Sequence, residues 1–231
     1  MARGGRICVS VMANDAIGVL AAVMPVVPLV DVVEIRLDGM QDPRIEPCIA
    51  EISLPVLVTN RPVWEGGQFD GSEQDRIDLL CKAVQSGAQY VDIELRTEAD
   101  LVAQLQKKAR KHGAEVIISS HDFQGTPTLA KLQETLRLMI ASGADIGKIV
   151  TTAANAEEAL RILSLQQEAT ACGFPLSAFA MGAAGRISRL ATLYLGGFMT
   201  YAALNAQQAT APGQLSVNDL CALISLLEQS A

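Results

Sequence analysis

The sequence has few aromatic residues, only two histidines and an excess of negative charge. Aromatic residues make up 4% of the chain, and the formal net charge is −7. A chain without a basic patch or an aromatic and basic groove is not expected to bind nucleic acid. The five cysteines form no CxxC pair, and with so little histidine no zinc site is expected, nor any other metal site.

Cysteine usage and one apolar run bear on where the protein works. Five cysteines cannot all pair within one chain, so a reducing cytoplasm is the expected location. Residues 16–30, AIGVLAAVMPVVPLV, resemble the apolar core of a signal peptide, but the strand-like RICVSVM precedes them and they contain two prolines. The run is also short for a membrane span. A first strand and helix is therefore the preferred interpretation, with no membrane association.

A pattern of apolar, β-branched run, polar loop and helical stretch repeats along the whole chain. Because strands alternate with helices, we expect a parallel sheet. Eight such units in 231 residues, with no linker, predict one (β/α)8 barrel over residues 1–231. A doubly wound open sheet is the alternative, weakened because no glycine-rich phosphate loop follows the first strand. The expected strands are 6–12, 31–38, 55–62, 90–95, 115–123, 145–153, 174–182 and 197–205.

Polar and charged residues gather toward the C-terminal ends of five of these strands. Alternate residues of a strand share a face. The C-terminal strand ends of a barrel meet at one mouth, where active sites are built. Mutual pairing for stability is the alternative, but charges buried only for stability rarely improve on apolar packing, so we favour a polar ligand. The groups that share a face are Glu34 with Arg36 and Asp38, Asp92 with Glu94, Ser119 with His121, and Lys148 with Val150 and Thr152, while Arg61 ends its strand.

Lys148 and His121 are the candidates for covalent and acid–base chemistry. Lys148 lies inside an apolar strand, whereas the other five lysines lie in segments with the pattern of solvated helices. A lysine among apolar side chains and near other cations loses its charged form more easily, and the free amine can form a Schiff base with a carbonyl. The alternative is a structural lysine paired with Asp92 or Glu94. His121 ends a strand and is either an acid–base group or a hydrogen-bonded structural histidine.

These residues lie in stretches that together resemble the type I 3-dehydroquinate dehydratases. The stretches follow the order of that family and cover nearly the whole chain. They are VEIRLD (33–38), RPVWEGGQFDG (61–71), YVDIEL (90–95), IISSHDF (117–123), KIVTTA (148–153), MGAAGRISR (181–189) and ATAPGQLSV (209–217). RPVWEGGQFDG (61–71) and a further stretch, GGFMTYAALN (196–205), are similar to the dehydratase half of the fused plant enzymes.

The resemblance implies a barrel that dehydrates 3-dehydroquinate to 3-dehydroshikimate in the shikimate pathway, without metal or cofactor. It implies that Lys148 forms the Schiff base, that His121 is the general acid–base group and that Glu65 is its partner. Asp92 is a candidate supporting acid, and Arg189 is expected to clamp the substrate carboxylate. The other expected substrate-binding residues are Glu34, Arg36, Arg61, Met181, Thr210 and Gln214. A homodimer is the expected assembly.

The sequence departs from the family in the loop that closes over the substrate. That loop usually reads Ser-Ala-Pro-Gly-Gln, and here it reads TAPGQ, with Thr210 in place of serine. Threonine keeps the hydroxyl but adds a methyl group and stiffens χ1. Two other functions stay open: a Schiff-base aldolase on a similar barrel, and an inactive barrel that only binds a small acid.

Overall fold

Eight parallel strands form one sheet in the computed structural model, which describes residues 2–229. The sheet order is β7-β6-β5-β4-β3-β2-β1-β8. Strands β1 to β7 therefore lie in the order of the sequence, and β8 pairs with β1. The prediction of a (β/α)8 barrel is confirmed, and each strand lies within its expected range. The strands are β1 (Arg6–Val11), β2 (Val32–Arg36), β3 (Val56–Thr59), β4 (Tyr90–Glu94), β5 (Glu115–His121), β6 (Ile146–Thr152), β7 (Leu176–Met181) and β8 (Met199–Ala203).

The barrel closes at a seam between β7 and β8, the two ends of the sheet. The backbone N–H of Phe198 donates to the Leu176 carbonyl at 2.8 Å. One residue further on, the Met199 N–H donates to the Ser177 hydroxyl at 3.1 Å instead of to a backbone carbonyl. A serine side chain thus takes the place of a ladder bond, which holds the two strands together in a nearly closed barrel.

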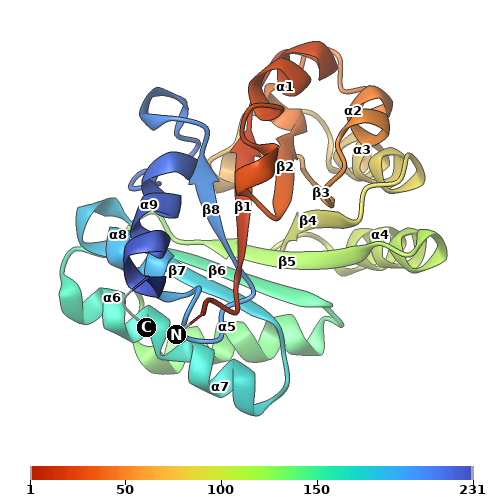
Figure 1. Cartoon of the computed structure of the whole chain (residues 1–231). Coiled ribbons are helices and arrows are strands. Elements are labelled where there is room, and N and C mark those ends of the chain that lie inside the picture. Colours follow the sequence, from red (N-terminus) through yellow and green to blue (C-terminus); the bar gives the residue numbers. More distant parts are fainter. Residues whose placement is uncertain (1, 230–231) are drawn as a thin grey trace.

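Helices surround the strands on the outside, as Figure 1 shows. The two ends of the chain lie side by side, and the Arg3 N–H donates to Glu228 of the last helix at 2.9 Å. The helices are α1 (Ala16–Val23), α2 (Glu46–Glu51), α3 (Glu73–Gln85), α4 (Ala99–His112), α5 (Leu129–Ala141), α6 (Ala156–Leu163), α7 (Leu165–Ala171), α8 (Gly182–Ala191) and α9 (Val217–Glu228). Between β6 and β7 the chain forms two short helices, α6 and α7, which are separated at Ser164.

Polar caps begin several of these helices where the sequence places them. The side chains of Asp15 and Ser216 accept hydrogen bonds from the N–H groups of Gly18 and Asp219, as N-cap residues do. Four short 3-10 helices are present among the described residues. They are η1 (Val27–Leu29), η2 (Leu37–Gly39), η3 (Val63–Glu65) and η4 (Ala206–Gln208). Of these, η2, η3 and η4 follow strands at the mouth, whereas η1 precedes β2 at the opposite end of the barrel. Among the described residues, no helix is long and apolar enough to cross a membrane.

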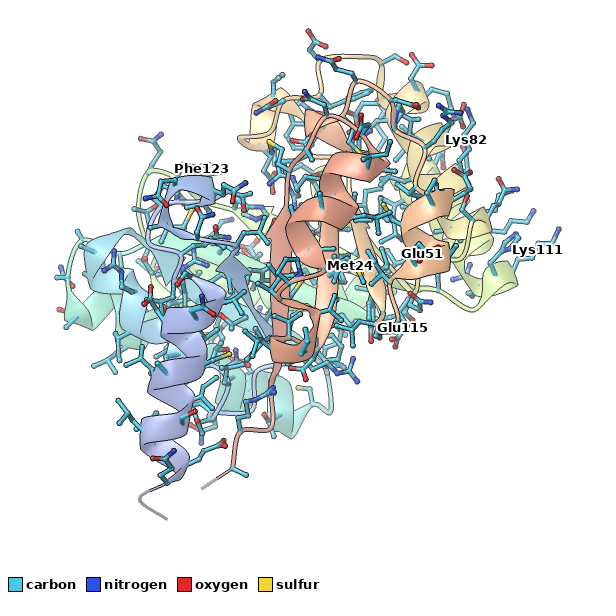
Figure 2. All side chains as sticks on the ribbon, turned by 45° about the horizontal axis from the view of Figure 1, so that its top comes forward. Met24, Glu51, Lys82, Lys111, Glu115 and Phe123 are labelled. Carbon is cyan, nitrogen blue, oxygen red and sulfur yellow. The ribbon has the colours of Figure 1, made fainter. Side chains whose placement is uncertain are left out.

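The barrel interior changes from apolar to charged along the strands. Its lower part is packed with buried apolar side chains such as Val32, Leu57 and Ile117, while the upper part holds the charged residues of the strand ends. Figure 2 marks the two ends of β5: Glu115 begins the strand and Phe123 follows its end, on opposite sides of the molecule. The apolar base therefore supports a charged mouth from below.

Candidate active site

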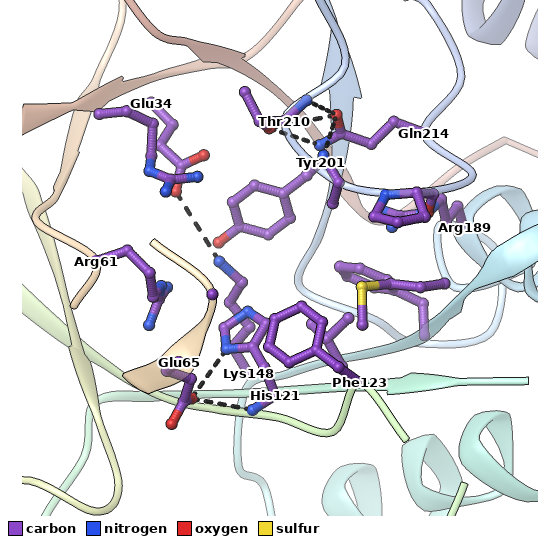
Figure 3. Close-up of a pocket in the computed structure, with 17 residues that line it drawn as sticks. Glu34, Arg61, Glu65, His121, Phe123, Lys148, Arg189, Tyr201, Thr210 and Gln214 are labelled. Carbon is purple, nitrogen blue, oxygen red and sulfur yellow. Dashed lines mark hydrogen bonds and ion pairs between the residues drawn. The ribbon is translucent and has the colours of Figure 1, made fainter. Parts of the chain in front are cut away.

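A cavity of about 280 Å³ opens at the C-terminal ends of the strands. Ten of the eleven expected site residues line it, and the eleventh, Asp92, lies beneath it against Lys148. The structure therefore brings together side chains from seven separate segments (Figure 3). The expected residues that line it are Glu34, Arg36, Arg61, Glu65, His121, Lys148, Met181, Arg189, Thr210 and Gln214.

Lys148, on β6, is buried and directed into this cavity. Its Nζ lies 3.1 Å from Asp92 Oδ2 and 3.9 Å from Glu34 Oε1. Glu94, the other partner considered from the sequence, is instead bound to arginines. The lysine's ion-pair partners are thus carboxylates of β4 and β2, which reach it across the barrel interior, so the pairing with Asp92 considered from the sequence is present. These surroundings stabilise a positive charge on the nitrogen, and the lysine both pairs with Asp92 and faces the cavity.

A closed network of ion pairs occupies the β3–β5 side of the cavity. Arg61 donates from Nη2 to Asp92 at 2.8 Å and from Nη1 to Glu94 at 2.5 Å. The second oxygen of Glu94 accepts from Arg76 of helix α3 at 2.5 Å, and the Ser119 hydroxyl donates to Asp92 at 2.7 Å. Each charge in this network therefore has a partner of opposite sign.

The pKa values on this side follow from burial and from the opposing charges. Burial alone lowers the pKa of Arg61, but the carboxylates of Asp92 and Glu94 outweigh it, and the pKa is raised. Burial alone raises the pKa of Asp92, but the charges of Arg61 and Lys148 outweigh it, and the pKa is lowered. Asp92 thus stays ionised beside the lysine, which makes it a supporting anion.

His121 and Glu65 form a hydrogen-bonded pair at the rim. Glu65 Oε1 lies 3.0 Å from Nδ1 of the imidazole and accepts from the His121 backbone N–H, also at 3.0 Å. Glu65 ends the short helix η3, which Gly66 closes in the left-handed conformation at φ +77°. At Gly67 a Cβ would lie 2.0 Å from the Arg61 carbonyl, so the GG pair allows the turn that points Glu65 at the imidazole.

Both members of this pair have shifted pKa values. Burial, assisted by the positive charges of Arg61 and Lys148, lowers the pKa of His121 well below its usual value. Burial raises the pKa of Glu65 to about 7. A neutral imidazole beside a carboxyl group that titrates near neutrality is suited to accept and return a proton.

The end of β2 differs from the sequence prediction. Asp38 was expected to share a strand face with Glu34 and Arg36, but the strand ends at Arg36 and residues 37–39 form η2. This turn brings Asp38 back onto the guanidinium of Arg36, with two hydrogen bonds of 2.8 and 2.6 Å. Asp38 therefore holds Arg36 and does not line the cavity, while Glu34 accepts from Thr59 at 2.7 Å.

On the β7–β8 side of the cavity, a buried arginine has hydrogen-bond donors that are not fully used. Arg189, on α8, is 2% exposed, and its recorded polar contact is one 3.3 Å hydrogen bond from Nη2 to the Pro212 carbonyl. Its buried Nε has no partner within the described part of the chain. Burial lowers the pKa of this guanidinium to about 10. A buried arginine without a carboxylate is suited to receive one from a ligand.

The loop after β8 carries Thr210 and Gln214 across the mouth. The Gln214 side-chain oxygen accepts from the backbone N–H of Thr210 at 2.8 Å and of Ala211 at 3.3 Å. Its Nε2 donates to the Thr210 hydroxyl at 3.1 Å. Gly213, at φ +78°, lies so close to Gly182 that a Cβ would be 2.7 Å from its carbonyl oxygen. Gln214 thus stabilises the loop itself, in addition to facing the cavity.

Three aromatic residues of the site were missed in the sequence. Phe123 stacks on His121, with ring centroids 6.1 Å apart and planes 16° from parallel. Phe179 and Tyr201 line the cavity beneath Arg189 and Lys148. Strand alternation places Phe179 on the same face as Met181, so the sequence could have indicated that Phe179 points into the barrel. An aromatic residue in an apolar strand is, however, usually an ordinary core residue.

Comparison with known proteins identifies the family. A sequence model described as type I 3-dehydroquinase matches residues 7–231. The chain is 43% identical over 190 residues to the 3-dehydroquinate dehydratase of Desulfotalea psychrophila, covering 82% of this chain and 84% of that one. It is also 36% identical over 195 residues to the chloroplastic bifunctional 3-dehydroquinate dehydratase/shikimate dehydrogenase of Arabidopsis thaliana, covering 82% of this chain and 32% of that protein.

A solved structure agrees with this match. The type I 3-dehydroquinate dehydratase of Clostridium difficile, solved with covalently modified comenic acid, is 27% identical. The two structures superpose with a TM-score of 0.88, which covers 100% of this chain and 94% of that one. The chain belongs to the type I 3-dehydroquinase family.

Proposed function

We propose that the chain is a hydro-lyase of the shikimate pathway that dehydrates 3-dehydroquinate to 3-dehydroshikimate through an imine on Lys148. Membership of the family carries the activity. The mechanism is supported by the position of the Lys148 amine, which is buried, faces the cavity and lies 3.1 Å from the Asp92 carboxylate. That arrangement supports a cation on the lysine nitrogen both before and after it reacts.

The first step is condensation of the Lys148 amine with the substrate ketone. The nitrogen forms a bond to the carbonyl carbon, the oxygen leaves as water, and the product is a protonated iminium. The iminium withdraws electrons from the ring, so a proton on the adjacent carbon becomes acidic. Asp92 and Glu34 lie beside the positive nitrogen and offset its charge.

His121 is the group that moves protons in the elimination. Its Nδ1 faces Glu65, which leaves Nε2 for the substrate. A neutral imidazole, favoured by the lowered pKa of His121, removes the proton next to the iminium. The same imidazole then returns it to the departing hydroxyl, which leaves as water. Hydrolysis of the iminium releases the product and restores Lys148.

Recognition of the substrate is divided between carboxylate and hydroxyl groups. Arg189 offers a guanidinium with unused donors, which suits bidentate binding of the substrate carboxylate. Glu34, Arg36 and Arg61 are the polar groups on the opposite wall, placed for the ring hydroxyls, and Met181 supplies an apolar surface. Holding both ends of the substrate orients the reacting carbon toward Lys148 and His121, a large source of rate enhancement.

The test is the intact mass of the protein after treatment with 3-dehydroquinate and borohydride, followed by peptide mapping. The expected result is one added ligand on the Lys148 peptide, and loss of both adduct and turnover in Lys148→Ala. His121→Ala should still form the adduct, with turnover lowered by about 10²- to 10⁴-fold, the range for a general acid–base group. An alanine variant at position 148 that labels and turns over as wild type contradicts the mechanism.

Two alternatives give different results in the same assays. A Schiff-base aldolase would form adducts with aldol substrates and would cleave a carbon–carbon bond. An inactive acid-binding barrel would bind 3-dehydroquinate without forming an adduct. The intact set of Lys148, His121, Glu65 and Arg189 around one cavity favours the dehydratase over both.

A homodimer in the cytoplasm, with 3-dehydroquinate as ligand and no nucleic-acid partner, completes the proposal. The cytoplasmic location is supported by the five cysteines, all of which are free thiols. The net charge of −7 opposes binding to phosphate backbones. Light scattering during gel filtration measures the assembly. Salt-dependent micromolar binding in a gel shift with DNA or RNA would count against the absence of a nucleic-acid partner.

A further inference from the structure

Two of the cations that line the cavity, Lys148 and Arg189, each lie over the face of an aromatic ring. Nζ of Lys148 is 3.9 Å from the centre of the Tyr201 ring, and the Arg189 guanidinium is 4.8 Å from the centre of the Phe179 ring. The two rings contact each other, with centroids 6.0 Å apart and planes inclined at 45° (Figure 3). Lys148 Nζ and the Arg189 guanidinium therefore contact two aromatic rings that also contact each other.

Tyr201 offers Lys148 its ring face and not its oxygen. The side chain is buried, and its hydroxyl has no hydrogen-bond partner among the described residues. The hydrogen bond of Lys148 Nζ goes to Asp92 instead. Burial, together with the negative charges near the barrel centre, raises the pKa of the phenol well above its usual value. Tyr201 is therefore a neutral ring whose negative face points at the lysine nitrogen.

The ring face differs from the carboxylates in how it responds to imine formation. An ammonium group has three N–H donors, which can bond both Asp92 and Glu34. In the structure one hydrogen bond goes to Asp92, and Glu34 is an ion-pair partner at 3.9 Å. The iminium has a single N–H and a planar, more diffuse charge, so it can make at most one such hydrogen bond. Attraction to a ring face depends on positive charge near the ring and not on an N–H direction, so the iminium, with fewer N–H donors, depends on it more than the ammonium does.

We propose that Tyr201 is a further catalytic residue, whose ring face stabilises the iminium formed on Lys148. The inference rests on the imine mechanism proposed above. Strand geometry provides the position: Tyr201 lies on the inward face of β8, in register with the small Cys8 of β1. The Tyr201 hydroxyl is not needed for this role, because it bonds nothing in the site.

Three variants at position 201 separate the ring face from shape and from the hydroxyl. Tyr201→Phe keeps the ring, Tyr201→Leu removes it, and pentafluorophenylalanine at this position keeps the shape while reversing the charge of the face. The readouts are the fraction of protein trapped by borohydride at a fixed, subsaturating 3-dehydroquinate concentration, and kcat. We expect the phenylalanine variant to stay within about twofold of wild type. The leucine and pentafluorophenylalanine variants should form about tenfold less iminium, the effect of a desolvated cation–π contact.

Phe179→Leu is the matched control, because it removes the neighbouring ring and leaves the one under Lys148. It should raise KM through Arg189 while the trapped fraction at saturating substrate stays at the wild-type level. The inference is overturned if the leucine and pentafluorophenylalanine variants trap as much iminium as wild type, or if Tyr201→Phe loses as much as Tyr201→Leu. Absence of adduct in the wild-type protein would instead reject the imine mechanism, and this inference with it.

Discussion

The two walls of the cavity differ in whether their buried charges are paired. On the β3–β5 wall, Arg61, Asp92, Glu94 and Ser119 bond one another, so the charges are satisfied before any ligand arrives. On the β7–β8 wall, Arg189 is just as deeply buried but has no carboxylate. The charges of the first wall are thus already paired, and they surround Lys148 and His121 before the substrate binds. The second lacks an anion, and the substrate carboxylate is the group that supplies it.

The pKa values of the two arginines express the same difference. Opposing carboxylates raise the pKa of Arg61, whereas burial without such a partner lowers that of Arg189 to about 10. A buried cation whose folded-state pKa is depressed costs stability at neutral pH. The unpaired Arg189 thus lowers the stability of the folded protein but is available to bind an anion, as is common in functional sites.

Arg76 provides the largest expected effect and tests the paired wall. It is fully buried, bonds Glu94, Glu73 and Thr97, and does not line the cavity. Arg76→Met leaves Glu94 with one arginine, so the free energy of unfolding should decrease by about 3–5 kcal/mol. Urea denaturation measures it, with Arg76→Lys as the charge-conserving control. An unchanged unfolding midpoint would show that this wall is not held by its ion pairs.

Arg189→Met makes the same substitution on the β7–β8 wall and should have the opposite signature. KM should rise about 100-fold, because two charge-assisted hydrogen bonds to the substrate carboxylate are lost. The free energy of unfolding should be unchanged or higher, since no buried anion loses a partner. Steady-state kinetics and urea denaturation give both values, and Arg189→Lys, which keeps the charge without the fork, should be intermediate. A loss of stability as large as that of Arg76→Met would contradict the comparison.

Glu65→Gln tests whether the rim pair also costs stability. Because the pKa of Glu65 is raised to about 7, the folded protein holds this proton more tightly than the unfolded chain. Stability from this group is therefore full below the unfolded value of about 4.5 and decreases as the pH rises to about 7. Glutamine has no charge to bury, so Glu65→Gln should be about 3 kcal/mol more stable at pH 8 and no more stable at pH 4. Urea denaturation at the two pH values measures this.

The same variant should leave the acidic limb of catalysis in place. The pKa of Glu65 is raised to about 7 and that of His121 is lowered well below its usual value, so Glu65 is already protonated where the imidazole gains its proton. Glutamine removes no charge in that range, so kcat/KM should have a lower maximum with an unchanged acidic limb. A limb that moves to lower pH would show that Glu65 is ionised beside the protonated imidazole.

The loop provides the smallest expected effect. Gln214→Ala removes the acceptor for the N–H groups of Thr210 and Ala211, so KM should rise several-fold, corresponding to about 1 kcal/mol. Thr210→Ser keeps the hydroxyl and should be milder. Hydrogen exchange of residues 206–214 should slow when the borohydride-reduced adduct is present and quicken in Gln214→Ala. Equal exchange in all three states, with a wild-type KM, would make this segment an ordinary turn.

Much of the fold was predictable from the sequence because it depends on local geometry. Side chains alternate between the two faces of a strand, and eight apolar strands separated by helices leave few topologies. Alternation also predicts that Glu34, Arg36, His121 and Lys148 point inward, whereas Glu65, Arg189, Thr210 and Gln214 lie outside the strands and were expected from the family resemblance alone. The inward direction of Lys148, the third residue of β6, required nothing beyond that periodicity.

Tertiary structure alone decided which charges meet. Lys148 pairs with Asp92 and Glu34 and not with Glu94, because strand register and barrel curvature set the distances across the mouth. Arg76 reaches Glu94 from a helix outside the barrel, and no strand pattern predicts that contact. Tyr201 looks like any core residue until the neighbouring strands place a lysine over its ring. Periodicity is a property of one segment, whereas a partner depends on how distant segments pack.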